Sequence, residues 1–243
     1  MKLNDTTSEQ GLCQDTRFLL GLAVNDTVSY SDNNLIRNIN AWYRQVDSWI
    51  WDASGKWEYD DSNYNNLPIA TTALVASQAD YSLPTTARKI LRVEVLDSNG
   101  NYNKLTQIDQ SQITDAMSEF QDTTGMPKYY DMVGESIMLY PAPAAANVTT
   151  TAGLKLSFSR TIDEFATTDT STQPGFESNF HRALSIGAAL DWAISKDEGG
   201  SLTNLITGLT SQLALQKESI AKFYGMRNSD MRPRIIPQID NSI

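Results

Sequence analysis

The most constraining feature of this sequence is a long amphipathic pattern near its N-terminus. Apolar residues recur every three or four positions from Leu35 to Ile50, for about four turns, which is the period of a helix with one buried face. The pair Ser31-Asp32 precedes the pattern, and the side-chain oxygens of these residues can cap the first free N–H groups. The stripe is rich in Trp and Tyr, so it must bury a large apolar area against another element.

Further helical patterns lie at both ends of the chain. Residues 10–24 contain a short apolar segment that predicts a first helix. Residues 176–196 and 201–224 predict two more helices, separated by Gly199-Gly200. Gly225 is a suitable residue to end the last one, since glycine tolerates the left-handed backbone of a helix C-terminus.

The middle of the chain is typical of β-structure. Residues 90–96 form a β-branched run that is followed by Asn99-Gly100, a strong hairpin signal. Residues 128–140 predict a second hairpin around Gly134, and the alternating residues 154–158 predict a strand with one exposed face. Residues 109–120 could form a short helix between these hairpins.

These patterns together predict an α+β protein. The helices of the two chain ends have no other evident place to bury their stripes, so we expect them to form one helical bundle from residues 1–60 and 163–225. Residues 61–162 are then an inserted β-rich domain. Residues 226–243 contain Pro233 and Pro237, cannot form one continuous helix, and are predicted to be an extended C-terminal arm.

Composition excludes several kinds of catalytic and metal site. The 243 residues include one cysteine, Cys13, and one histidine, His181, which excludes an intramolecular disulfide framework and zinc sites with several histidines. His181 has no nucleophile motif near it, and the chain has no glycine-rich phosphate loop. We therefore expect no enzyme, no cofactor and no metal. The start of a calcium loop at residues 97–101 has its glycine at the wrong position and is better interpreted as a hairpin turn.

The charge balance argues against a protein that wraps nucleic acid. Nineteen basic and 29 acidic residues give a net charge of −10, which repels phosphates. Residues 45–87 alone carry one positive and six negative charges, a balance of −5. The acidic residues that we single out there are Asp52, Glu58, Asp60 and Asp61. They could form a solvated loop, or a carboxylate pair with Trp57 beside it as a sugar platform, as in glycosidases.

The C-terminal segment has the opposite charge. Residues 217–234 carry five basic and two acidic side chains, a balance of +3. Two interpretations remain open, a frayed terminus or an arm that binds a partner through arginine anchors and isoleucines. The residues of this candidate binding segment are Arg227, Arg232, Arg234, Ile235, Ile236 and Pro237.

The sequence shows no targeting signal. Met1 to Gln14 is polar and lacks the basic and apolar regions of a signal peptide, and no run of about 18 apolar residues could span a membrane. We expect folding in a reducing cytoplasm and no membrane partner.

Several short stretches in this order and spacing resemble the head-to-tail adaptor proteins of tailed bacteriophages, similar in architecture to the tail tubular protein A or gatekeeper class. The resemblance covers about residues 30–225 and depends on the combination of these motifs, none of which carries chemistry. The stretches are WEYDDSNYNNLPIA (57–70), DYSLP (80–84), ILRVEV (90–95), PKYYD (127–131), LYPAP (139–143) and PGFESNFH (174–181).

The resemblance implies a structural virion protein in the neck of the phage, made in the cytoplasm of the bacterial host. It implies a ring of about twelve copies that binds the portal protein and a further neck or tail protein, such as a stopper, nozzle or tail tube. Genomic DNA would pass through the ring without sequence-specific binding. By position we assign residues 232–237 to portal contact and the acidic residues to the channel or its rim. Two alternatives stay open, a carbohydrate- or receptor-binding tail module and a carboxylate glycoside hydrolase.

Overall fold

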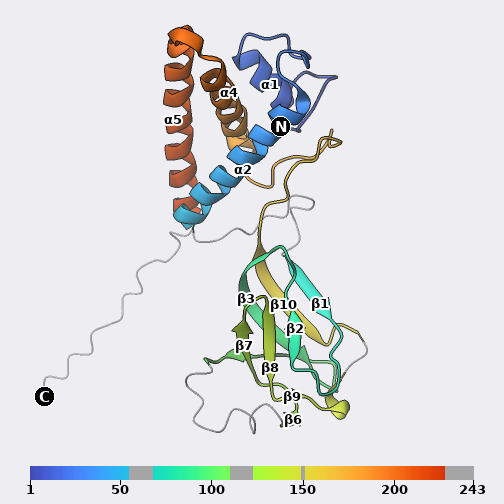
Figure 1. Cartoon of the computed structure of the whole chain (residues 1–243). Coiled ribbons are helices and arrows are strands. Elements are labelled where there is room, and N and C mark those ends of the chain that lie inside the picture. The colour runs from blue at the N-terminus through green and yellow to red at the C-terminus, as the bar shows by residue number, and fades with distance from the viewer. Residues whose placement is uncertain (55–67, 110–122, 149–150, 228–243) are drawn as a thin grey trace, which may run out of the picture. The chain divides into compact units, whose positions relative to one another are not determined.

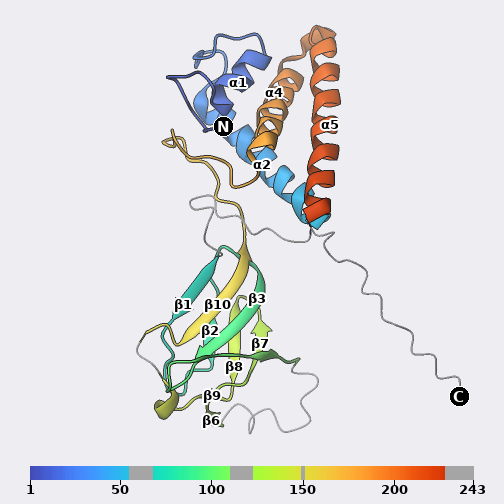
Figure 2. The ribbon, with the colours of Figure 1, turned by 180° about the vertical axis from the view of Figure 1, so that it is seen from behind.

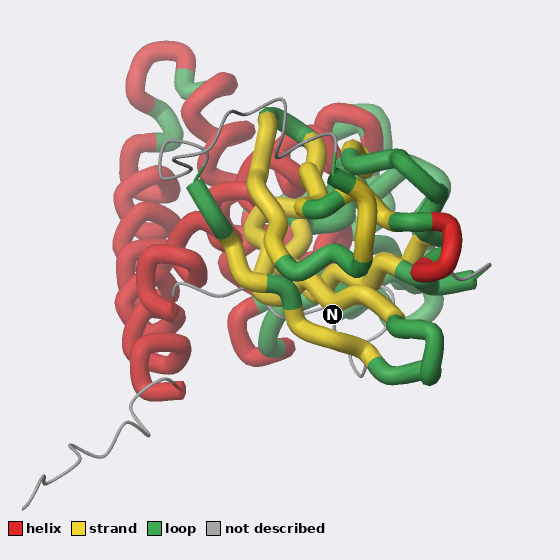
Figure 3. Tube along the Cα trace, turned by 90° about the horizontal axis from the view of Figure 1, so that it is seen from below, coloured by secondary structure: helices red, strands yellow, loops and turns green. Residues whose placement is uncertain are grey.

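The computed structural model describes residues 1–54, 68–109, 123–148 and 151–227. The chain divides into two compact units, a helical unit of Met1–Trp57 with Ile162–Ile243, and a β unit of Glu58–Thr161. Apart from a short 3-10 turn at Ala145–Asn147, the described helices belong to the first unit and the strands to the second (Figure 1, Figure 3). The predicted mixed α+β class is therefore confirmed.

The helical unit combines segments from both ends of the chain. Helices α2, α4 and α5 pack against one another, and α1 packs mainly on α4. Two opposite views agree that α4 lies between α1 and α5 (Figure 1, Figure 2). The bounds are Leu12–Leu19 for α1, Asp32–Ser54 for α2, Arg182–Lys196 for α4 and Thr203–Arg227 for α5.

A glycine allows α2 and α4 to approach closely. A Cβ atom at Gly187 of α4 would overlap the indole ring of Trp42 on α2. The same indole donates its N–H to the Asp191 carboxylate at 2.8 Å, one turn further along α4. Trp42 thus packs its ring against the α4 backbone and satisfies its polar atom on the same helix.

The first helix is shorter than predicted. Its last residue is Leu19, not a residue near Asn25, because Gly21 adopts a left-handed backbone with φ of 70°. The N–H groups of Gly21 and Leu22 then bond back to the carbonyls of Phe18 and Arg17, both at 3.0 Å. This arrangement is a Schellman motif, which satisfies the last carbonyls of a helix.

A buried arginine holds the loop that follows α1. The Arg17 guanidinium donates to the carbonyls of Val24 at 3.4 Å and Tyr30 at 3.0 Å, and it also pairs with the Asp32 carboxylate at the start of α2. The Arg17 side chain is only 2% exposed, so these oxygens replace the water that a buried charge would otherwise lose. The contacts fix the path of the chain between α1 and α2.

The last two helices differ from prediction at their ends. α4 begins at Arg182 rather than 176, after a 3-10 turn at Ser178–Phe180. Gly199 and Gly200 separate α4 from α5 as predicted, with φ of 78° and 80°. Gly225 does not end α5, which continues to Arg227, so the predicted boundary of the C-terminal arm at 226 falls inside the helix. Gly225 instead lies next to α2, where a Cβ would be 3.9 Å from the Ala53 carbonyl oxygen.

The β unit contains two four-stranded sheets and a two-stranded one within the residues described. One sheet has the order β1-β10-β3-β4 and another β2-β8-β7-β5, while β6 pairs with β9. Figure 2 shows β10 between β1 and β3. The bounds are Ile69–Thr72 (β1), Asp80–Ser82 (β2), Ala87–Leu96 (β3), Tyr102–Lys104 (β4), Thr106–Gln107 (β5), Thr124–Gly125 (β6), Tyr129–Val133 (β7), Ser136–Tyr140 (β8), Ala142–Pro143 (β9) and Leu154–Arg160 (β10).

The core of the β unit draws side chains from both four-stranded sheets. Val93 and Leu156 come from one sheet, Ile137 and Leu139 from the other, and all belong to one buried cluster. Both predicted hairpins are confirmed, β3–β4 and β7–β8. The helix that we predicted at 109–120 lies almost entirely outside the described residues.

The chain returns to the helical unit through a segment that is tied to α2. The Asn40 side chain donates to the Phe165 carbonyl and accepts from the Phe165 N–H, both at 2.9 Å. The Tyr43 hydroxyl accepts from the Gly175 N–H at 2.7 Å, and its ring stacks on Phe165. Side chains of α2 therefore replace the regular structure that residues 163–175 lack.

Substituting alanine for two glycines should have opposite effects on stability. We expect Gly187→Ala to lower the free energy of unfolding of the helical unit by about 2 kcal/mol or more, because Trp42 must move. Gly208 lies inside α5 with open space around it, so Gly208→Ala should raise that free energy by about 1 kcal/mol. Urea unfolding followed by tryptophan fluorescence measures both. Equal effects of the two changes would contradict the proposed packing at Gly187.

Candidate interaction surfaces

The single histidine is part of the core. His181 is fully buried, and its ring packs edge-on against Phe176 with 5.0 Å between centroids. Its Nε2 lies 2.8 Å from the Phe176 carbonyl oxygen, so this nitrogen donates, and Nδ1 accepts from the Met1 amino group at 2.6 Å. Burial lowers the pKa of His181 to about 4. The imidazole is therefore neutral at pH 7, and both of its nitrogens are occupied.

Cys13, the single cysteine, is also part of the core. Cys13 is fully buried, and burial raises the pKa of its thiol to about 12. Among residues 1–54, 68–109, 123–148 and 151–227, no three His, Cys, Asp or Glu side chains gather as a metal site would require. Within the same ranges, no helix is long and apolar enough to cross a membrane. In the β3–β4 turn, Asp97 accepts hydrogen bonds from the N–H groups of Asn99 and Asn101, so its oxygens stabilise the hairpin.

Of the acidic residues that we singled out, the structure describes only Asp52. Asp52 lies in the last turn of α2 and is exposed. Glu58, Asp60 and Asp61, together with Trp57, lie outside the described residues. The structure thus places one carboxylate on the surface of the helical unit and does not test whether the others lie beside it.

The predicted arm is described only at its beginning. Arg227 is the last residue of α5. Arg232, Arg234, Ile235, Ile236 and Pro237 lie outside the described residues. The binding role of this segment remains a prediction.

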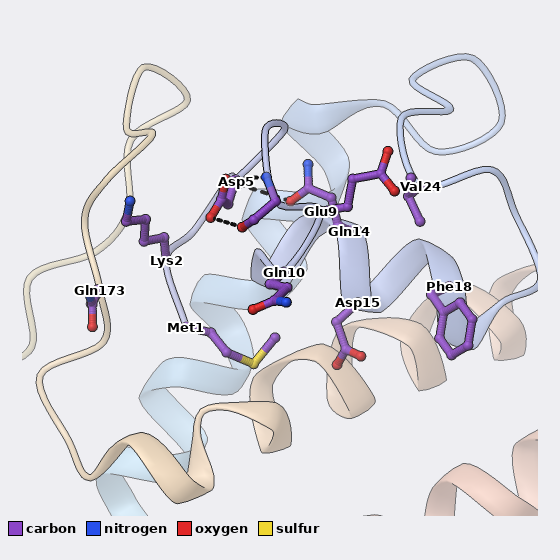
Figure 4. A pocket seen from close by; sticks show the side chains of 11 residues that line it. Met1, Lys2, Asp5, Glu9, Gln10, Gln14, Asp15, Phe18, Val24 and Gln173 are labelled. Atoms are coloured by element: carbon purple, nitrogen blue, oxygen red, sulfur yellow. Dashed lines mark hydrogen bonds between the residues drawn. The ribbon is translucent and has the colours of Figure 1, made fainter.

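The sequence did not indicate a pocket that lies between residues 1–10, α1 and the segment 163–175 that returns from the β unit. We call it the α1 pocket; its volume is about 800 Å³, and it is open to solvent. Figure 4 shows Glu9, Val24 and Phe18 at one end of it, and Asp15 on the α1 side. The Phe18 side chain is 67% exposed. The lining residues are Met1, Lys2, Asp5, Ser8, Glu9, Gln10, Gln14, Asp15, Phe18, Val24 and Gln173.

The carboxylates of the α1 pocket have different surroundings. Asp5 accepts hydrogen bonds from the N–H and hydroxyl of Ser8, and these bonds lower the pKa of Asp5. Burial raises the pKa of Asp15, although Arg182 lies 3.4 Å from its Oδ2. Glu9 is exposed. The pocket therefore combines an apolar end with a lining of mixed charge, in which three carboxylates are offset by Lys2, by the Met1 amino group and by Arg182 beside Asp15.

A second surface lies on the outward face of α5. Among the described side chains of this helix, Leu209, Leu213, Ile220 and Tyr224 are buried, while Phe223 is 36% exposed. At 100° per residue, the opposite face is a stripe of exposed residues spaced by three and four. We call it the outer stripe: Asn204, Gly208, Ser211, Leu215, Glu218, Lys222 and Met226.

The outer stripe includes two large apolar side chains among polar and charged ones. Its apolar members Leu215 and Met226 are 65% and 59% exposed. No charged residue occurs between Thr203 and Gln216. The hydroxyls of Thr207 and Ser211 bond back to carbonyls one turn earlier, at 2.8 and 2.9 Å. This part of α5 therefore offers an uncharged surface that mixes polar and apolar side chains.

The β unit has a smaller cavity between two edge strands. It measures about 240 Å³ and lies between β1 and β2, with Leu83, Leu154 and Leu156 in its wall. β1 and β2 each stand at the edge of a sheet. The sequence did not indicate this cavity, because its walls come from three separate strands.

A comparison with protein families gives a match over most of the chain. A family model described as SU10 adaptor protein matches residues 10–230, a range that includes the described parts of both units apart from the first residues. No curated protein matches the chain.

The buried histidine predicts a dependence of stability on pH. The unfolded chain binds a proton on His181 near pH 6.5, whereas the folded chain does so only near pH 4. Lowering the pH through this window therefore favours the unfolded state, and the neutral imidazole should contribute on the order of 3 kcal/mol above pH 6.5 that is lost by pH 4. The contribution is absent from a His181→Gln variant, which keeps one donor and one acceptor.

Urea unfolding of both proteins between pH 4 and pH 7 tests this expectation. The difference between their unfolding free energies isolates His181 from acidic groups that titrate in the same range, such as Asp15. A difference that does not change with pH would contradict a neutral, buried imidazole.

Proposed function

Because this chain belongs to the SU10 adaptor protein family, we propose that it joins the portal to the tail of a bacteriophage as a ring of identical copies. Family membership makes the chain a structural phage adaptor, associated with other head or tail proteins in the virion. The observation that carries the proposal is the family match itself, which spans the helical unit and the β unit alike.

The proposal assigns a role to each part of the chain. The helical unit, as a bundle of helices from both chain ends, forms the wall of the ring. The β unit faces neighbouring neck or tail proteins, such as a stopper, nozzle or tail tube. The C-terminal arm contacts the portal through Arg232, Arg234 and the isoleucines between its prolines. The closer resemblance to the tail tubular protein A or gatekeeper class, with about twelve copies, is part of the same proposal.

The acidic charge fits a passage for DNA. We propose that Asp52, with Glu58, Asp60 and Asp61, lines or flanks the channel. A net charge of −10 repels phosphates, so genomic DNA could slide past without binding to the wall. The locally basic segment 217–234 would then serve protein contacts rather than DNA.

Removing the residues after Arg227 should abolish portal binding. Since α5 ends at Arg227, a chain truncated there keeps every described helix. We expect an unchanged circular dichroism spectrum and unfolding midpoint, but no complex with the portal protein of the same phage in native mass measurements. Two full-length variants separate the contributions, Arg232→Gln with Arg234→Gln for charge, and Ile235→Ser with Ile236→Ser for apolar contact. A truncated chain that assembles at full strength would exclude the arm from portal contact.

Reversing the acidic charge should slow DNA release. Particles in which Asp52, Glu58, Asp60 and Asp61 are all changed to Lys should eject DNA more slowly, because phosphates would bind the wall. Higher salt should restore the rate, as it weakens such contacts. The matched control reverses exposed carboxylates of the β unit, Asp80→Lys with Glu135→Lys. Wild-type ejection by the fourfold variant would place these carboxylates away from the DNA path.

A further inference from the structure

The two four-stranded sheets of the β unit share one core and turn their other faces outward. Val93 and Leu156 point into that core from the sheet β1-β10-β3-β4, while Ile137 and Leu139 point into it from the sheet β2-β8-β7-β5. Successive side chains of a strand alternate between faces, so the neighbours of these residues lie on the outer faces. The β unit therefore has two outer sheet faces, on opposite sides of its core.

The outer face of the first sheet is basic. Glu94 of β3 lies opposite Lys155 of β10 and opposite Lys104 of β4, so these side chains form one row across three strands. Arg92 lies two residues before Glu94 on the same face, and an irregularity in the β3–β10 register brings Lys89 to this face as well. Four basic residues and one acidic residue give the face a balance of +3. We call it the basic face.

Glu94 holds two of these basic side chains in place. Its Oε1 accepts from the Arg92 Nε at 2.7 Å, and its Oε2 lies 3.4 Å from the Lys155 Nζ. The Lys155 ammonium also lies 4.8 Å from the centre of the Tyr102 ring. Side chains that are already held lose less conformational freedom when a partner binds, so the basic face is pre-organised for a contact.

The outer face of the second sheet is acidic. Asp80 of β2 and Asp131 of β7 lie on either side of Met138 of β8, again in one row across three strands. The exposed Glu135 follows in the β7–β8 turn, and the four described strands of this sheet contain no basic residue. Lys128 precedes β7 and, by the alternation along the strand, points to the other side of the sheet from Asp131. We call this surface the acidic face.

The two rows match in spacing, and the two faces match in apolar content. Neighbouring strands lie about 4.8 Å apart, so the two lysines of the basic row stand about 10 Å apart at their Cα atoms, as do the two aspartates of the acidic row. Each face also exposes large apolar side chains beside its charges. These are Ile69 (49% exposed) and Tyr102 (37%) on the basic face, and Tyr129 (41%) and Val133 (46%) on the acidic face.

We propose that the basic face of one copy docks against the acidic face of the next copy, with Lys104 and Lys155 facing Asp80 and Asp131. The inference rests on the ring proposed above and names one of the contacts that hold it together. Both faces belong to one chain, so each copy offers one face to each neighbour. Such a head-to-tail contact repeats from copy to copy and closes into a ring when the rotation between copies allows it.

A second copy fits the basic face better than a nucleic acid does. Glu94 in the middle of the basic row repels phosphates, and so does the net charge of −10 of the whole chain. The exposed apolar side chains of the face would find no partner on a phosphate backbone. The acidic face supplies both what the lysines need and what the apolar side chains need.

Charge reversal on one face at a time tests the pairing. Lys89→Glu with Lys104→Glu reverses exposed residues of the basic face, and Asp80→Lys with Asp131→Lys reverses the row of the acidic face. Each variant then carries two faces of like charge, so it should not assemble with the portal protein of the same phage in native mass measurements. Self-association of the concentrated free chain, measured by sedimentation, should weaken about tenfold or more, and that of the wild type should weaken with salt.

Mixing the variants separates a lost contact from a lost fold. A chain with two acidic faces matches a chain with two basic faces, so an equimolar mixture of the two variants should assemble again, which misfolded chains could not do. The chain that carries all four changes should assemble with itself but not enter wild-type rings. The neutral change Lys89→Gln with Lys104→Gln, which places no new carboxylate beside Glu94, should weaken self-association to a smaller degree.

A matched control reverses two exposed lysines of the helical unit. Lys196→Glu with Lys222→Glu changes the net charge by the same amount as the basic-face variant and should assemble like the wild type. The ejection control described above, Asp80→Lys with Glu135→Lys, reverses part of the acidic face. It should therefore lower the number of particles that form, but not the ejection rate of those particles.

Two results would overturn the inference. An equal loss of assembly in the matched control would reduce the effect to net charge. Loss from the basic-face variant without recovery on mixing would show that this face binds something other than a second copy, such as DNA. Rings on the portal from both reversed variants would leave the proposed function standing and remove only the inference, whereas self-association that recovers on mixing, without any portal binding, would do the reverse.

Discussion

The helical unit depends on the close approach of α2 and α4 at Gly187. These helices precede and follow the β unit in the sequence, so the contact of Trp42 with Gly187 closes a loop of 187 − 42 = 145 residues. Closing a flexible loop of that length costs about 4 kcal/mol in chain entropy. This entropy cost is lower if the β unit folds first, because a folded β unit holds its own two ends together and leaves a shorter flexible loop to close. The indole ring and its bond to Asp191 then hold the two halves of the helical unit together.

Polar side chains on the helices determine where the returning chain runs. Asn40 and Tyr43 bind it at Phe165 and Gly175, and the Tyr224 hydroxyl accepts from the Glu177 N–H at 3.0 Å. The Leu3 N–H bonds to the Thr172 carbonyl, which brings the N-terminal segment alongside. One wall of the α1 pocket is therefore a consequence of hydrogen bonds made on α2 and α5. A mutation at Asn40 or Tyr43 would alter the pocket without touching it.

Sequence patterns predicted the elements whose signal lies within one short stretch of the chain. The period of apolar residues located α2, and Asn99-Gly100 located the β3–β4 turn, because both signals are local. The end of α1 was wrong because Gly21, rather than the apolar pattern, stops that helix. β1 was not predicted as a strand, since its four residues are mostly exposed at a sheet edge.

Surfaces were harder to predict than elements. The α1 pocket joins residues as distant as Glu9 and Gln173, and no local pattern indicates such a meeting. The outer stripe did leave a signal, the absence of charge from Thr203 to Gln216, but the same residues also fit a buried helix. Only the positions of α2 and α4 show which face of α5 is exposed.

The pairing of β1 with β10 has a consequence for how this protein can vary. Ile69, at the start of β1, lies opposite Ser157 in the middle of β10, and the Phe158 N–H bonds to the Pro68 carbonyl at 3.2 Å. The chain thus enters and leaves the β unit at neighbouring points. Such a unit is an insertion whose two ends lie side by side. Its loops can be lengthened or shortened while residues 68 and 158 keep their places, so the β unit can change without changes in the helices.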